Sequence, residues 1–230
     1  MRVVSMIASS TEIVCALGCQ DQLVGISHEC DFPHSIKKLP VTTEIKFVAD
    51  GTSNQIDQRV KAILQEGLSV YRVKADLLKE LKPDLILTQI QCEVCAVSLN
   101  DVKAATCDWL GISPEIVSLS TNSLDDLWRD IRVVAAALKV EKQGDILISQ
   151  LKTRLSVLNQ HAKELVRKLD HPLRVACIEW IDPLMAAGNW VPELLELAEA
   201  ENLFGKAGGH SPWMTWDELV LKDLVRWLKS

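Results

Sequence analysis

Cys92 and Cys95 are the residues whose spacing points most directly to chemistry. They form a Cys-x-x-Cys pair between a predicted strand and a predicted helix, where the amino end of the helix favours a thiolate. A structural zinc site usually needs four ligands, so this pair supplies half of one. His28 and Cys30 follow another predicted strand and would complete a Cys3His set if the two loops meet. The pattern therefore indicates a zinc site, a redox pair, or buried thiols without chemistry.

The motifs of the common enzyme classes are missing from the sequence. There is no Gly-x-Ser-x-Gly nucleophile turn, phosphate-binding loop or dinucleotide fingerprint. The glycine-rich segment 205–209 has the wrong spacing for a phosphate-binding loop. No nucleophile is predicted beside a base, so we expect a protein that is not an enzyme.

Apolar runs predict strands, and apolar-periodic segments predict helices. In the first half of the chain, strands are predicted at 2–7, 23–26, 85–88 and 115–119, and helices at 53–66, 74–81 and 99–110. The run Leu85–Thr88 is almost wholly apolar, which is typical of a strand buried on both faces of a parallel sheet. Ser9–Glu12 has the composition of a helix cap, and Gly18 ends the helix that it opens. This order of elements predicts a doubly wound α/β lobe.

The second half of the chain predicts a long helix and a further α/β unit. Residues 122–168 are predominantly helical and are divided near Glu141, and a strand at 173–178 and helices at 193–201 and 216–223 follow. The predicted fold class is α/β, with two doubly wound lobes joined by a long bridging helix. The domains are an N-terminal lobe at 1–140, the bridging helix at 141–168 and a partial C-terminal lobe at 169–230. The second lobe is expected to be incomplete, because the sequence stops where an apolar strand should follow helix 216–223.

Composition excludes several classes of protein. The 230 residues are 48% hydrophobic and 24% charged, which is enough to bury a core. A net charge of -6 offers no cationic face to nucleic acid. No apolar run approaches the roughly 18 residues that span a bilayer, so we expect a protein that does not span a membrane. Seven scattered cysteines and the lack of a signal peptide predict reduced thiols and a cytoplasmic location.

Several motifs occur in an order that resembles one protein family. They are Ser-x-Thr-Glu-Ile-Val near the start, Val-Gly-Ile-Ser-His-Glu-Cys-Asp at the second strand, Pro-Asp-Leu-Ile-Leu-Thr-Gln followed by Cys-x-x-Cys, and Gly-Gly-His-Ser-Pro-Trp at 208–213. Together they resemble the cobalamin-binding branch of the iron-siderophore and vitamin B12 solute-binding proteins of ABC transporters, of the class III periplasmic-binding-protein type. The resemblance covers residues 2–223. It implies two α/β lobes, one rigid connecting helix and a ligand in the cleft between the lobes.

The resemblance also implies a ligand and a set of binding residues. The ligand would be cobalamin or a similar corrinoid, a broad macrocycle that needs aromatic faces and scattered hydrogen-bonding groups. His210 is the best candidate to bind the cobalt, because imidazole is an axial donor and the neighbouring glycines let the backbone approach closely. The predicted ligand-binding residues are Ser10, Thr11, His28, Glu29, Asp31 and Gln91 in the first lobe and Trp180, Asp182, Asn189, Trp190, His210, Ser211 and Trp213 in the second.

The same residues allow other interpretations. Each tryptophan could simply pack in the core, and His210 could form a hydrogen bond within its loop. By the habit of the family, Glu12 and Glu93 could dock on arginines of an ABC transporter permease, and the location would be periplasmic if the amino terminus is incomplete. The alternatives to corrinoid binding are a cytoplasmic metal or redox protein that uses Cys92 and Cys95, with Cys30 and His28 as further ligands, and a truncated relic that binds no ligand.

Overall fold

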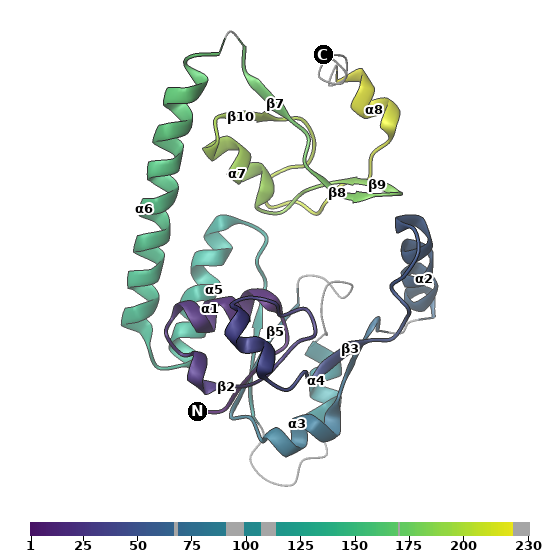
Figure 1. Ribbon diagram of the computed structural model, residues 1–230, viewed down its shortest axis with the longest axis vertical. Coiled ribbons are helices and arrows are strands. Elements are labelled where there is room, and N and C mark those ends of the chain that lie inside the picture. The colour runs from purple at the N-terminus through teal and green to yellow at the C-terminus, as the bar shows by residue number, and fades with distance from the viewer. Residues whose placement is uncertain (67–68, 91–98, 107–113, 170, 223–230) are drawn as a thin grey trace. The chain divides into compact units, whose positions relative to one another are not determined.

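The computed structural model describes residues 1–66, 69–90, 99–106, 114–169 and 171–222 (Figure 1). The chain divides into two compact units. The first consists of Met1–Asp50, Gln58–Ser120 and Trp128–Ile148, and the second of Gly51–Asp57, Thr121–Leu127 and Ser149–Ser230.

A parallel sheet of four strands forms the centre of the first unit. The strands are β1 (Val3–Ser5), β2 (Leu23–Ile26), β5 (Leu85–Gln89) and β6 (Glu115–Leu119), in the order β2-β1-β5-β6. Every residue of β1 and β5 is buried, as the apolar composition of 85–88 predicts. The order reverses beside β1, and ligands of α/β proteins bind beyond the carboxyl ends of strands at such a point. The predicted α/β fold class with a parallel sheet is confirmed.

Helices, turns and an antiparallel strand pair come between the strands of this sheet along the chain. They are α1 (Ala8–Ala16), α2 (Ser53–Gln65), α3 (Ala75–Leu81), α4 (Leu99–Thr106), two 3-10 turns, η1 (Gln20–Gln22) and η2 (His34–Lys38), and the antiparallel pair β3 (Thr43–Ile45) and β4 (Tyr71–Val73). The core cluster joins the sheet to β4, α3 and α4 through Val4, Met6, Tyr71, Leu78, Ile86 and Val102. Burial of these side chains therefore fixes the strand ends that carry the polar residues.

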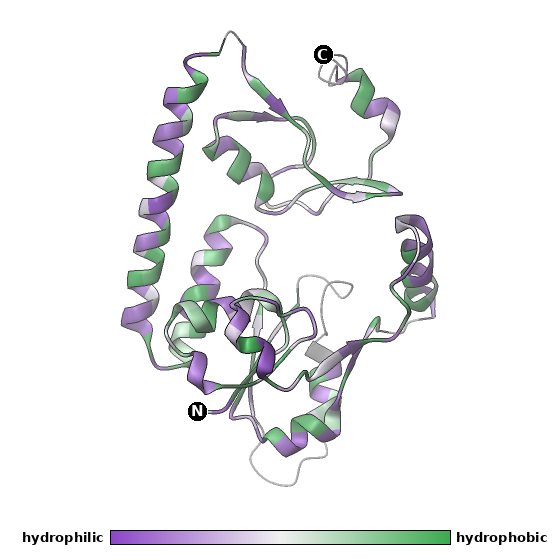
Figure 2. Ribbon diagram, viewed as in Figure 1, coloured by the Kyte–Doolittle hydropathy of each residue, from purple (hydrophilic) through white to green (hydrophobic). Residues whose placement is uncertain are grey.

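Two helices follow the sheet, and glycine lets them pack closely. They are α5 (Leu124–Ala137) and α6 (Glu141–Val166), so the predicted division near Glu141 is confirmed. A Cβ atom added at Gly144 would lie 2.7 Å from the Cβ of Ala135. Hydrophilic and hydrophobic residues alternate along α6 (Figure 2), and within the described ranges no helix is long and apolar enough to cross a bilayer.

The second unit contains two small sheets and a small core. Its elements are β7 (Leu173–Val175), β8 (Ile178–Ile181), β9 (Leu184–Ala186), α7 (Val191–Leu197), β10 (Ala200–Asn202) and α8 (Trp216–Leu221). β7 pairs in parallel with β10, and β8 pairs antiparallel with β9. The buried cluster consists of Leu184, Ala186 and Met214, with Phe204 and Leu219 packed against it.

Two sequence predictions for this unit were wrong in detail. The strand expected at 173–178 is two strands, β7 and β8, and Leu173 in β7 is 43% exposed. The helix expected at 193–201 begins at Val191 and ends at Leu197. It ends early because Glu199 adopts a left-handed conformation with φ of 56°, which turns the chain into β10.

We expect Gly144→Leu to destabilise the first unit by about 1–3 kcal/mol, because a larger side chain would separate α5 from α6. Urea unfolding measures the effect. Gln143→Leu, at the adjacent exposed position, is the matched control and should change the free energy of unfolding by less than about 0.5 kcal/mol. Equal losses in both variants would mean that the close helix contact contributes nothing.

Candidate functional site

Three hydroxyl groups close the turn between β1 and α1. The Oγ atoms of Ser5 and Ser10 lie 2.6 Å apart, and Thr11 donates from Oγ1 to Ser5 Oγ at 2.7 Å. All three residues are fully buried. The prediction that Ser9–Glu12 caps the helix was wrong: Ile7 occupies the cap position without a side-chain hydrogen bond, and Ser10 donates to the carbonyl of Ile7 instead. Ser10 and Thr11 thus hold the turn together and present no hydroxyl to solvent.

Cys30, in the loop after β2, contacts this cluster of three hydroxyl groups. Its Sγ lies 3.1 Å from Oγ1 of Thr11, and the residue is 7% exposed. Burial raises the pKa of the Cys30 thiol, and the hydrogen bond from Thr11 only partly opposes that shift. A protonated, buried thiol is a poor metal ligand and a poor nucleophile, so the surroundings of Cys30 favour a structural role.

The backbone amide and the side chain of His28 both bond to the side chain of Thr43 in the neighbouring strand pair. Oγ1 of Thr43 donates to Ser27 Oγ at 3.1 Å, so this oxygen accepts from Nδ1 of His28 at 2.8 Å. The imidazole ring also lies 5.4 Å from the ring of Tyr71. Nε2 is buried and lies 3.2 Å from Oε1 of Glu29 without the alignment of a hydrogen bond.

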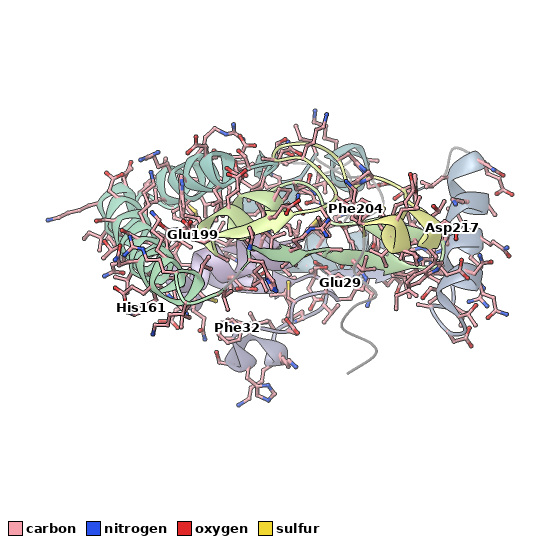
Figure 3. All side chains as sticks on the ribbon, turned by 90° about the horizontal axis from the view of Figure 1, so that it is seen from above. Glu29, Phe32, His161, Glu199, Phe204 and Asp217 are labelled. Carbon is pink, nitrogen blue, oxygen red and sulfur yellow. The ribbon has the colours of Figure 1, made fainter. Side chains whose placement is uncertain are left out.

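The other residues predicted in the first lobe divide into two groups. Glu29 and Asp31 are exposed on the loop after β2, close to the exposed Phe32 (Figure 3). Gln91, Cys92, Glu93 and Cys95 lie outside the described residues. Within the described ranges, no group of three or more His, Cys, Asp or Glu side chains could hold a metal ion.

In the second unit, close backbone contacts bring two loops together. One loop is Ala187–Trp190, and the other is Gly205–Trp213. The amide of Asn189 donates to the carbonyl of Gly209 at 2.7 Å, and the amide of Gly208 donates back to Asn189 at 2.9 Å. A Cβ atom at Gly188 would lie 2.6 Å from the oxygen of Gly209, and one at Gly205 would lie 2.4 Å from the oxygen of Ala187. Glycine is therefore required at both positions, because a side chain would push the two loops apart.

Ser211 and His210 are oriented by this arrangement. Ser211 is 4% exposed; its hydroxyl accepts from the amide of Gly188 at 3.1 Å and donates to the carboxylate of Glu179. Nδ1 of His210 lies 2.9 Å from the backbone oxygen of Ser211. Because a carbonyl oxygen can only accept, Nδ1 carries a proton, and in the neutral form of the ring the lone pair is therefore on Nε2. The exposed His210 thus presents Nε2 as an acceptor.

The three predicted tryptophans differ in their contacts and exposure. Trp180 donates from Nε1 to the carbonyl of Asp182 at 2.9 Å, which closes the turn after β8. Trp190 is 37% exposed and Trp213 is 56% exposed, so both offer aromatic surface. The carboxylate of Asp182 accepts from the side-chain amide of Asn54 at 3.2 Å.

Sequence reasoning missed several partners of these residues. Thr43 and Tyr71 position His28, and Glu179 positions Ser211. Glu179 lies directly before the predicted Trp180 at a strand end, which is a signal that sequence reasoning could have used. Thr43 and Tyr71 give no such signal, because only strand pairing brings them to His28.

Comparisons with known proteins support the resemblance. No family model matches the chain. The chain is similar to an uncharacterized ABC transporter substrate-binding lipoprotein, YvrC, of Bacillus subtilis, with 24% identity over 226 residues, 96% of this chain and 60% of YvrC. It is also similar to the vitamin B12-binding protein of Pectobacterium atrosepticum, with 26% identity over 229 residues, 98% of this chain and 68% of that protein.

Solved structures have the same fold. The periplasmic vitamin B12 binding protein BtuF of Vibrio cholerae superposes with a TM-score of 0.63 at 19% identity, over 96% of this chain and 72% of that chain. The relatives and structural neighbours are ABC transporter substrate-binding proteins of the vitamin B12, iron-siderophore and haem class, so the resemblance predicted from the ordered motifs is confirmed. The chain spans about three fifths of the length of YvrC.

We expect Cys30 in the folded protein to react with iodoacetamide at least about tenfold more slowly than in urea, because burial keeps its thiol protonated and covered. Peptide mapping by mass spectrometry at pH 7.5 measures each cysteine separately.

The raised pKa of the Cys30 thiol also stabilises the fold below about pH 8.5, which is the usual pKa of an unfolded thiol. This contribution is lost as the pH rises through the raised pKa of the folded state. Equally fast labelling in both states would contradict the buried position of Cys30.

Gly188→Ala should displace the loop that carries His210, because the new methyl group would collide with backbone atoms of Gly209 and Ser211. A loss of about 1–3 kcal/mol in the unfolding of the second unit is expected, together with shifted amide resonances at 205–211. Ala207→Ser, in the exposed part of the same loop, is the control. It should leave the free energy of unfolding and the amide resonances near those of the wild type. Unshifted resonances in Gly188→Ala would show that the loops are not in close contact.

Proposed function

We propose that the chain binds a corrinoid such as cobalamin and serves as a solute-binding component of an ABC transporter. The observation that carries this proposal is the exposed His210 on a glycine-rich loop, with its Nδ1 bonded to a backbone oxygen and its Nε2 left as a donor to a metal. A histidine that binds a metal commonly donates its other ring nitrogen to a carbonyl oxygen in this way. The similarity to a vitamin B12-binding protein supports the same ligand class.

The surroundings of His210 suit a large, flat ligand. Trp190 and Trp213 expose aromatic faces on the two loops that contact each other, and aromatic faces bind extended ring systems well. Asn189 has a left-handed φ of 52°, and its backbone amide and carbonyl both bond to the glycine-rich loop. We therefore assign the binding role to His210, Trp190, Trp213 and Asn189, with Asp182 and Trp180 beside them.

The predicted residues of the first unit have different roles in this proposal. Glu29 and Asp31 are exposed and able to contact a ligand, and His28 is fixed beside them by Thr43. Ser10, Thr11 and Ser211 support the backbone through buried hydroxyl groups. The proposed role is ligand capture without catalysis, and a transporter permease is the proposed partner. The relatives named lipoprotein or periplasmic support a place of action outside the cytoplasm for the whole protein.

A visible-absorbance titration with hydroxocobalamin tests this proposal. We expect saturable binding near one equivalent and a shift of the cobalt bands, because imidazole replaces the water on the metal. His210→Ala should abolish the band shift and weaken binding by about 10- to 100-fold. His161→Ala, which removes an exposed histidine on α6 (Figure 3), is the matched control and should behave as wild type.

Two results would contradict the proposal in different ways. A band shift that persists in His210→Ala would remove the axial role from this residue. An absence of binding by soluble, cooperatively unfolding wild-type protein would overturn corrinoid binding itself.

A further inference from the structure

A cavity of about 470 Å³ opens on the second unit next to His210. Its wall is formed by residues of the loop after β10 and by the residue that follows α8: Leu203, Phe204, Lys206, His210, Pro212 and Lys222. Phe204 is labelled in Figure 3. The cavity is large enough for a substituent of a ligand and too small for a whole corrinoid ring system.

The charged side chains that line the described part of the cavity are both lysines. Lys206 and Lys222 are both exposed, and neither forms an ion pair with a residue that the structure describes. Nζ of Lys222 lies 6.0 Å from the centre of the Phe204 ring, so the ammonium group is held over the apolar wall. Among the lining residues that the structure describes, none is a carboxylate. The cavity thus combines an apolar base with two ammonium groups that have no described counter-ion.

Hydrogen bonds and a close backbone contact hold the loop at the base of the cavity. Gly205 has a left-handed φ of 79° and packs against the backbone of Ala187. Its carbonyl accepts from the side-chain amide of Asn202 at 3.3 Å, and the amide of Gly209 donates to the carbonyl of Lys206 at 3.0 Å. Because this backbone is already hydrogen-bonded, ordering the two lysine side chains is the main entropy cost that we expect when an anion binds.

We propose that this cavity binds an anionic oxygen group, a phosphate or a carboxylate, carried on an apolar part of the ligand. The proposal rests on the proposed function in one respect: a ligand whose metal binds to His210 would place its anionic oxygen group in the cavity. The amide fringe of a corrinoid is neutral, and the negative group of cobalamin is the phosphodiester of its nucleotide loop. Haem carries two carboxylates instead. Ammonium groups bind both kinds of anion by charge-assisted hydrogen bonds.

Phenyl phosphate tests the cavity without any metal chelate. Titration into 15N-labelled protein should shift the amide resonances of Gly205 and Gly209 saturably. The double variant Lys206→Met, Lys222→Met should bind about tenfold more weakly, and Lys168→Met, which removes an exposed lysine elsewhere in the second unit, should bind like wild type. Equal affinity of the double variant, or equally tight binding of neutral benzyl alcohol, would overturn the proposal.

Three chelates identify the source of the anion. Hydroxocobalamin contains the phosphodiester, diaquocobinamide lacks the nucleotide loop, and haemin carries carboxylates. If the phosphate is the group that binds, hydroxocobalamin should bind about tenfold more tightly than diaquocobinamide to wild type, and this advantage should disappear in the double variant. If the carboxylates bind, haemin should be the chelate whose affinity depends on the two lysines.

The outcomes separate this inference from the proposed function. Chelates that bind with the same affinity to wild type and double variant would overturn the anion site and leave the proposed function intact. Binding of phenyl phosphate in a lysine-dependent manner, with no binding of any chelate, would support the anion site and overturn the proposed function.

Discussion

The pairing of β1 with strands on both of its edges is the constraint on which the first unit depends. Val3, Val4 and Ser5 pair with β5 on one side, and the same strand pairs with β2 on the other. A strand enclosed in this way has no edge or face left for water, so its side chains must be apolar or must find partners. Ser5 finds its partners in Ser10 and Thr11. Those bonds direct the chain from the sheet into α1, and Thr11 also bonds to Cys30 in the loop after β2.

A different constraint acts in the second unit, where the buried cluster is small. Here backbone contacts between two loops replace much of what side-chain packing does in the first unit. Gly188 faces the backbone of Gly209 and Ser211 at distances that no Cβ atom could accept. Because the backbones are this close, the carbonyl of Ser211 is fixed where Nδ1 of His210 can donate to it. The orientation of His210 is therefore a consequence of glycine packing rather than of a dedicated side-chain partner.

Some polar residues of this protein form hydrogen bonds within the fold, and others are exposed without a partner among the described residues. The hydroxyls of Ser10, Thr11 and Ser211 bond to groups within the protein and are buried. Lys206, Lys222 and Nε2 of His210 have no such partner among the described residues, and all three groups border one cavity. A buried polar group without a partner is unfavourable, whereas an exposed one remains available to a ligand. This difference is the physical reason why we propose that the ligand binds near Lys206, Lys222 and His210.

The sequence by itself determined the class of the fold and most of its elements. The apolar run at 85–88 predicted a buried parallel strand, and the break near Glu141 predicted two helices, because local hydrophobic patterns reflect burial directly. It also led to the prediction that His210, which follows two glycines, binds the ligand. Only the tertiary structure decided what each polar residue does. Ser10 and Thr11 look like a helix cap in sequence, yet strand β1 supplies Ser5 as their partner. Lys206 and Lys222 are 16 positions apart and share no motif; they border one cavity because the loop after β10 and α8 pack on the same small core. Contacts between distant segments depend on how the chain packs, and a local pattern carries no record of them.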